Sequence, residues 1–147
     1  VIGIGNSLMA DDGIGLLVLE KIQEKLGERE GLEFIPLATG GMDLLHVLPG
    51  LNNVIIIDAG DFGGEVGDHQ VFSPEDVDTV KTIRGYSLHE LDIMRVLKLS
   101  EDMGESPEKI LMVAIQPDKV CYNDSSAGPT FSYNRAAGWR DLMKILQ

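Results

Sequence analysis

The amino-acid sequence predicts an α/β protein, a three-layer sandwich in which a twisted, mostly parallel sheet of about five strands lies between helices. Short apolar segments alternate with helical patterns along the chain. Residues 54–57 are a run of aliphatic, β-branched side chains, which is typical of a strand covered on both faces. Loops rich in polar residues and glycine follow these segments, where open parallel sheets bind ligands.

The first half of the chain predicts strand, helix, strand, helix and strand. Residues 1–4 form the end of a buried strand, and a loop leads to a helix that starts after Asp12 and ends near Gly27. The apolar face of this helix consists of Ile14, Leu17, Val18, Ile22 and Leu26. A strand over residues 32–37 and the strand over 54–57 flank a short helix, which we expect Asp43 to cap and which stops near Pro49.

In the second half, the strand over residues 70–72 should be antiparallel, because its connection to Asp58 is too short for a helical crossover. Residues 73–76 have the form of a helix start, with a turn or two expected before Arg84. Ser87 and Glu90 form a capping-box pattern at the start of a longer helix. A last strand at 110–115 and a helix at 130–146 complete the chain.

Composition indicates one folded domain spanning residues 1–147, since 44% of the side chains are hydrophobic and 24% are charged. The formal charge of −12 disfavours binding to nucleic acids or anionic membranes. Cys121 is the only cysteine, which excludes an internal disulfide and suits the cytoplasm. No apolar stretch approaches the ~20 residues of a transmembrane helix. We expect a cytoplasmic monomer with native residues upstream of Val1.

Two aspartates are candidates for chemistry. Asp12 follows a glycine turn and precedes a helix, so its commonest role would be an N-cap, although Asp11 is equally able to cap and would leave Asp12 for another task. Asp58 ends an aliphatic strand, where a carboxylate is costly unless it is paired, hydrogen-bonded or bound to a cation. The alternative for Asp58 is a cap or turn residue on the glycine-rich loop that follows, and Asp61 is a nearby competitor.

His89 is the third candidate, in the first turn of the helix that follows Ser87. The positive end of a helix disfavours the imidazolium, and a neutral ring can ligate a metal. The alternative is an ordinary surface or half-buried histidine, which is how we interpret His46 and His69. Two carboxylates and an imidazole could hold a metal ion with open positions, but this set does not choose the metal.

Other chemistries have weaker support in the sequence. Gly3-x-Gly5 resembles the start of a dinucleotide-binding fingerprint, but Leu8 stands where the third glycine should be. A Gly-x-Ser-x-Gly elbow is absent, and Cys121 has no neighbouring histidine in sequence. Cleavage of a peptide bond would therefore need the carboxylates, a metal, or both.

Three spaced motifs, at residues 3–15, 56–59 and 87–91, together resemble the maturation endopeptidases of nickel-iron hydrogenases. The resemblance implies that Asp12, at a position held by Glu or Asp in the family, is a nickel ligand together with Asp58 and His89. It also implies a substrate-binding glycine loop, formed by Thr39, Gly40 and Gly41. Residues 36–38 depart from the family here, because many relatives carry an acid and paired glycines at these positions.

The family removes a C-terminal extension from the hydrogenase large-subunit precursor after nickel insertion. Carried over, this implies a hydrolase whose nickel is supplied by the precursor and acts as a recognition signal; zinc or cadmium is an expected substitute in vitro. Asp12 or Asp58 would serve as a general base in aspartic-type cleavage, or the metal would polarise water. The alternatives are a nickel-checking maturation chaperone without catalytic activity and, third, a nucleotide-binding module.

Overall fold

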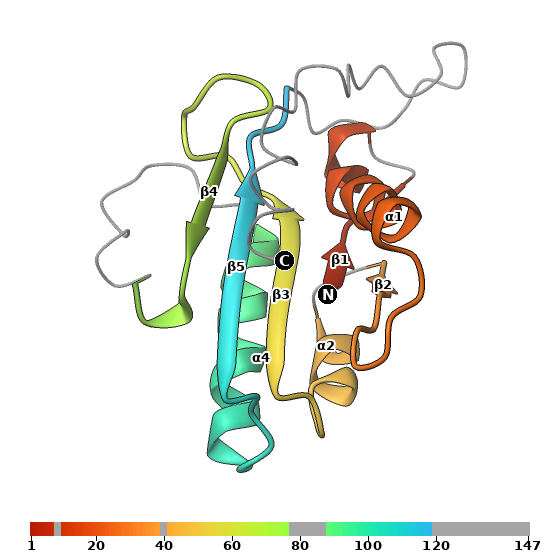
Figure 1. Ribbon diagram of the computed structural model, residues 1–147. Coiled ribbons are helices and arrows are strands. Elements are labelled where there is room, and N and C mark those ends of the chain that lie inside the picture. Colours follow the sequence, from red (N-terminus) through yellow and green to blue (C-terminus); the bar gives the residue numbers. More distant parts are fainter. Residues whose placement is uncertain (8–9, 39–40, 77–87, 119–147) are drawn as a thin grey trace.

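The computed structural model describes residues 1–7, 10–38, 41–76 and 88–118, and only the backbone of residues 10, 11 and 88–91. A five-stranded sheet forms its centre (Figure 1). The strand order is β2-β1-β3-β5-β4, and only β4 runs antiparallel to its neighbour. The strands are β1 (Ile2–Ile4), β2 (Ile35–Leu37), β3 (Asn53–Ala59), β4 (His69–Phe72) and β5 (Lys109–Ile115).

Strand pairing brings the ends of the parallel strands to one side of the sheet. Ile2 lies opposite both Ile35 and Ile56, and Asp58 lies opposite Ala114 near the end of β5. We call the side where β1, β2, β3 and β5 end the carboxyl edge, and the opposite side the amino edge. The predicted antiparallel strand is confirmed, because β4 pairs with β5 in the opposite direction and starts at the carboxyl edge.

Helices cover both faces of the sheet, which confirms the predicted α/β architecture. Figure 1 shows α1 (Ile14–Leu26) in front of the sheet and α4 (Leu88–Asp102) behind it, with α2 (Met42–Val47) beside α4. Two short 3₁₀ helices, η1 (Ala10–Gly13) and η2 (Pro74–Asp76), precede α1 and follow β4. None of the described helices is long and apolar enough to cross a membrane.

The core consists of two clusters, one on each face of the sheet, because successive strand residues point to opposite faces. Ile57 and Ala59 of β3 pack with α1, whereas Val54 and Ile56 pack with α2 and α4. This is why β3 needs aliphatic side chains at successive positions without polar alternation. By the same alternation, Asp58 projects toward the α2 and α4 face.

Several boundaries differ from the predicted ones. The strand expected at 32–37 begins only at Ile35, because Leu32 forms an isolated antiparallel bridge with Arg29 that turns the chain. The expected cap by Asp43 is wrong, because Gly41 is the N-cap of α2 and Asp43 lies in its first turn. Residues 77–87 lie outside the described residues. They include the end of the short helix expected before Arg84 and Ser87 of the capping-box pattern. The helix predicted at 130–146 also lies outside the described residues.

Candidate functional site

Asp58 is a buried carboxylate near the end of β3. Its residue is only 4% exposed, and Oδ1 accepts the backbone N–H of Ala59 at 2.8 Å. Burial of an ionised carboxylate carries a large desolvation cost, which hydrogen bonds or a cation must offset. The acid at this strand end is buried and lies within β3 itself, so it is not a turn residue of the loop that follows.

Asp12 is buried as well, at 6% exposure. It lies in η1, and its Oδ2 accepts the backbone N–H of Asn6 at 3.2 Å. The N-cap of α1 is Gly13, with no side-chain cap, so the N-cap position considered for Asp12 is wrong. The side chain of Asp11 lies outside the described residues. The 3₁₀ turn places Asp12 one residue too early to cap, and its carboxylate is tied to the loop that follows β1.

Glycines let η1 and α1 lie against the carboxyl edge at backbone contact. A Cβ on Gly15 would lie 2.2 Å from the carbonyl oxygen of Ile4 and 2.4 Å from that of Ile57. A Cβ on Gly5 would lie 2.1 Å from the carbonyl oxygen of Asp12. Only glycine permits such approaches. The motif glycines thereby hold the segment that carries Asp12 against the ends of β1 and β3, where Asp58 lies.

His89 is the second residue of α4, so its predicted position in a first helical turn is confirmed. The far end of α4 leads through residues 103–108 to the start of β5, at the amino edge. The helix has 15 residues and is about 22 Å long, close to the ~23 Å of the seven-residue β5. The first turn of α4 therefore lies toward the carboxyl edge, on the face to which Asp58 projects.

The side chain of His89 lies outside the described residues, so the complete ligand set stays a prediction. Among the side chains that the structure does describe, no three His, Cys, Asp or Glu residues form a group that could hold a metal ion. Thr39 and Gly40 also lie outside the described residues, and Gly41 is the N-cap of α2. The donor types of Asp12 and Asp58, two carboxylates in a buried setting, fit a divalent cation brought by a ligand.

Gln116 is a residue of this edge that sequence reasoning missed. It follows β5, is 7% exposed, and its side-chain oxygen accepts the backbone N–H groups of Phe62 and Gly64 at 3.0 and 3.1 Å. Its amide nitrogen donates to Asp61 Oδ1 at 3.0 Å and to the carbonyl oxygen of Pro117 at 3.3 Å. The sequence signal for Gln116 was an amide side chain placed directly after a buried strand and before a proline. Asp61, the competitor of Asp58, is exposed and holds this loop.

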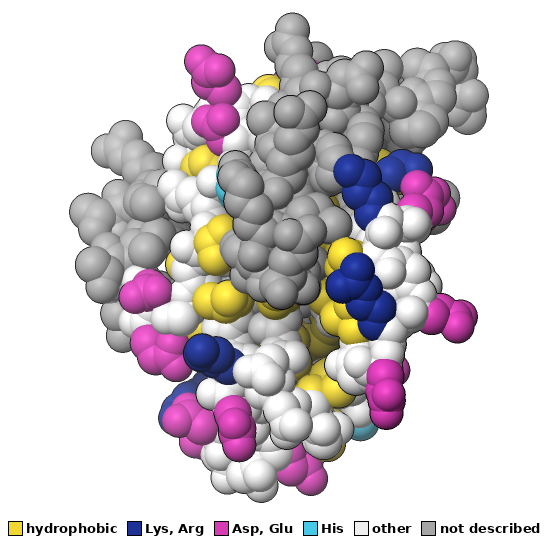
Figure 2. Space-filling model, viewed as in Figure 1, with side chains coloured by type: hydrophobic (Ala, Val, Ile, Leu, Met, Phe, Trp, Pro, Cys, Tyr) yellow, Lys and Arg dark blue, Asp and Glu magenta, His cyan; other side chains and the backbone are white. Residues whose placement is uncertain are grey.

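The other two histidines are an exposed and a half-buried residue, as expected from the sequence. His46 is exposed in the last turn of α2, and His69 is half-buried at the start of β4. Acidic side chains are spread around the face that Figure 2 shows rather than gathered in one patch. The excess of negative charge is thus distributed over the described surface in that view, and it does not mark a site by itself.

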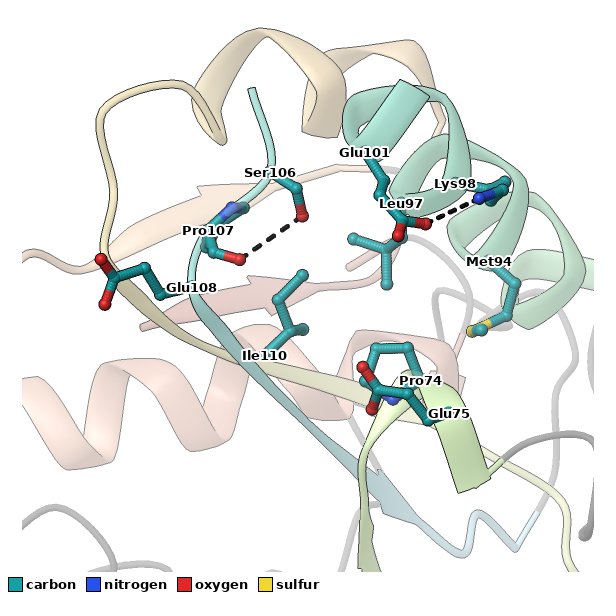
Figure 3. Close-up of a pocket in the computed structure, with 10 residues that line it drawn as sticks. All are labelled: Pro74, Glu75, Met94, Leu97, Lys98, Glu101, Ser106, Pro107, Glu108 and Ile110. Atoms are coloured by element: carbon teal, nitrogen blue, oxygen red, sulfur yellow. Dashed lines mark hydrogen bonds and ion pairs between the residues drawn. The ribbon is translucent and has the colours of Figure 1, made fainter. Parts of the chain in front are cut away.

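A cavity of about 560 Å³ lies at the amino edge, away from both buried aspartates (Figure 3). Its lining mixes apolar and polar side chains, and its acids are exposed. Lys98 pairs there with Glu101 at 2.8 Å and with Asp102 at 3.3 Å. The lining residues are Pro74, Glu75, Met94, Leu97, Lys98, Glu101, Ser106, Pro107, Glu108 and Ile110. Neither Asp12 nor Asp58 lines this cavity, so it is separate from the candidate site.

Solved structures with the same fold include two hydrogenase maturation proteins. The hydrogenase maturating endopeptidase HybD from Escherichia coli superposes with a TM-score of 0.69 at 22% identity, covering 99% of this chain and 89% of that one. The [NiFe] hydrogenase maturation protease HybD from Thermococcus kodakarensis gives 0.67 at 23% identity, covering 99% and 93%. At these identities the likeness establishes the fold.

Curated relatives carry related names. The hydrogenase expression/formation protein HoxM of Cupriavidus necator is 28% identical over 80% of this chain, which spans only 58% of the HoxM length. The hydrogenase 2 maturation protease of Escherichia coli is 28% identical over 82% of this chain and 73% of its own length. A family model described as hydrogenase maturation protease matches residues 16–124. Because this match covers well over half of the 147 residues, the chain belongs to the hydrogenase maturation protease family.

Proposed function

We propose that this protein is an endopeptidase that removes the C-terminal extension of a nickel-iron hydrogenase large-subunit precursor after nickel has been inserted. One observation carries the proposal: two carboxylates, Asp12 and Asp58, are both buried at the carboxyl edge of the sheet. Open α/β sheets bind their ligands at this edge. Burying a charged group is costly, so two buried carboxylates at this edge need a reason. Membership of the family makes proteolytic maturation the reason that best fits.

Nickel belongs to the substrate in this proposal. Asp12, Asp58 and His89 would contact nickel that cysteines of the precursor already hold, so that only a loaded precursor is positioned for cutting. The choice of nickel rests on the resemblance to the family, and the imidazole of His89 is a donor that suits this metal. The placement of the first turn of α4 on the face to which Asp58 projects makes a contribution from His89 geometrically reasonable.

The cleavage step would use one aspartate as a general base. That carboxylate accepts a proton from a water molecule while the water oxygen bonds to the carbonyl carbon of the scissile peptide. The C–N bond then breaks, and the proton passes to the leaving amine. The same aspartate would serve as the general base in addition to its contact with the nickel.

The decisive experiment compares nickel-loaded and nickel-free precursor, each incubated with the protein and analysed by mass spectrometry. The expected result is loss of a C-terminal peptide from the loaded sample alone. Equal cutting of both samples would remove nickel as the recognition signal but leave the peptidase. An unchanged mass of a precursor that nevertheless binds would replace the peptidase by a nickel-checking chaperone.

Three variants test the site against the rest of the surface. Asp58→Asn keeps an oxygen that can accept the Ala59 N–H but removes the charge, and we expect it to abolish cutting of the loaded precursor. Glu101→Gln removes an exposed charge at the amino edge and should cut at the normal rate. A fully active His89→Ala variant would remove that residue from the site.

A further inference from the structure

We propose that Gln116 is a positioning residue, which clamps residues 60–68 so that they form one wall of the groove that receives the precursor. This inference rests on the proposed function for the identity of the bound chain. The segment, here called the 60–68 loop, leaves β3 directly after Asp58 and Ala59 and returns to the sheet at β4. Because the loop starts two residues after Asp58, we place it beside the path of a peptide that reaches this carboxylate at the carboxyl edge.

The clamp uses both ends of the side-chain amide. The oxygen accepts from two loop N–H groups, those of Phe62 and Gly64, and the nitrogen donates to Asp61 Oδ1 within the same loop. Two donors on one side and acceptors on the other define which end of the amide is oxygen. One buried side chain thus contacts three residues of a loop more than fifty positions away in sequence.

The backbone completes the attachment of the loop to the end of β5. The N–H of Gln116 donates to the carbonyl oxygen of Asp68 at 2.8 Å, and its own carbonyl oxygen accepts from Gly67 at 3.0 Å. Gly60 donates to the carbonyl oxygen of Ile115 at 3.0 Å. The loop is therefore fixed at its start, middle and end, although Gly63, Gly64 and Glu65 are exposed.

The hydrogen bonds fix the exposed part of a loop that begins two residues after the buried Asp58. A fixed loop suits a substrate wall, because small displacements of a positioning element weaken productive binding. Gln116 acts through the loop and does not touch the reacting atoms in this proposal. Its loss should therefore weaken binding of the precursor and raise KM while kcat changes little.

The test replaces the amide and measures loop order and binding separately. In Gln116→Met the side chain keeps a similar size but loses the strong acceptor and both donors. We expect hydrogen exchange at the amides of Phe62 and Gly64 to accelerate about 10-fold or more. We also expect the Kd for the nickel-loaded precursor, measured by calorimetry, and the KM to rise about 10-fold, with kcat within about 3-fold of the original protein.

A paired exchange of amide and acid gives the rescue. Gln116→Glu keeps an acceptor for the two N–H groups but sets a carboxylate against Asp61. Adding Asp61→Asn supplies a new donor to that carboxylate, so the double variant should recover much of the loop order and precursor affinity. Asp61→Asn alone is the matched control and should behave normally, because its amide oxygen can still accept from Gln116.

Four outcomes of these measurements support or overturn the proposed role of Gln116. Faster loop exchange in Gln116→Met together with weaker precursor binding supports the inference, even if no precursor is ever cut and the proposed peptidase fails. Unchanged loop exchange would overturn the clamp. Faster amide hydrogen exchange with unchanged Kd and KM would overturn the proposal that the 60–68 loop is a wall for the precursor. A fall in kcat alone would also overturn it and assign Gln116 to the chemical step.

Discussion

The two edges of the sheet both carry acidic side chains, but in opposite physical states. At the carboxyl edge, Asp12 and Asp58 are 6% and 4% exposed, and each accepts a backbone N–H group. At the amino edge, Glu101 is exposed and pairs with the solvent-facing Lys98. Charge in water costs little and contributes little, whereas buried charge must be offset by specific partners.

This difference shows that a hollow surface is a poor guide to the site in this protein. The amino-edge cavity is of ligand size, yet its acids are solvated and already balanced in part by Lys98 (Figure 3). The carboxyl edge instead combines buried carboxylates with glycines that allow backbone contact. Burial and partners of the charged groups therefore carry more information about chemistry than the volume beside them.

The largest expected effect is at Asp58. Replacing its carboxylate by the amide in Asp58→Asn should lower the rate of precursor processing about 100-fold or more, because a general base or a charged nickel contact is lost. Processing is measured by mass spectrometry of the nickel-loaded precursor over time. The free energy of unfolding should be unchanged or higher, since a buried charge is removed. A variant with normal processing would place the chemistry elsewhere.

The second-largest effect is expected where α1 packs against the strand ends at the carboxyl edge. Gly15→Ala should lower the free energy of unfolding, measured with urea, by about 2–3 kcal/mol, because the new Cβ would meet backbone oxygens of Ile4 and Ile57 that cannot move independently. Processing should fall as well, since η1 carries Asp12 and adjoins α1.

Gly104→Ala supplies the matched control for that packing effect. Nothing lies within 4 Å of a Cβ there, but φ is +73°, so only the backbone conformation resists the change. We expect a cost of about 1–2 kcal/mol and normal processing. A smaller cost for Gly15→Ala than for Gly104→Ala would contradict the close contact between α1 and the strand ends.

At the amino edge the expected changes are small. Glu108→Gln removes one rim charge of the cavity, and both the free energy of unfolding and the rate of precursor processing should stay close to those of the original protein. The same assays as for Asp58→Asn apply. A loss of processing comparable with that of Asp58→Asn would erase the contrast between the two edges and make the cavity part of the site.

The smallest effect is a pH dependence near the amino edge. The backbone N–H and then the hydroxyl of Ser73, both 2.9 Å from Asp76 Oδ2, lower the pKa of Asp76 from its ordinary 3.8. The resulting stabilisation is complete above the ordinary pKa and is lost as pH falls through the lowered pKa of the folded state. Ser73→Ala should raise the pKa of Asp76 partway back, as an NMR titration can measure. No change would show that the hydroxyl does not contribute.

Much of the architecture could be predicted from local patterns. Apolar faces and glycine signals located α1, and the short connection after Asp58 correctly indicated an antiparallel β4. The position of His89 in a first turn was also predicted correctly. These features depend on neighbours a few positions away, which is the range over which periodicity and chain length act.

The sequence by itself determined the fold class and the burial of Asp58, because a strand of successive aliphatics must be covered on both faces and its last polar residue is buried with it. The tertiary structure decided the strand order, the pairing of Asp12 with the Asn6 backbone in place of a helix cap, and the clamp made by Gln116. These depend on contacts between strand ends and loops far apart in the chain. Such hydrogen bonds can form only after the sheet has brought the strand ends and loops together.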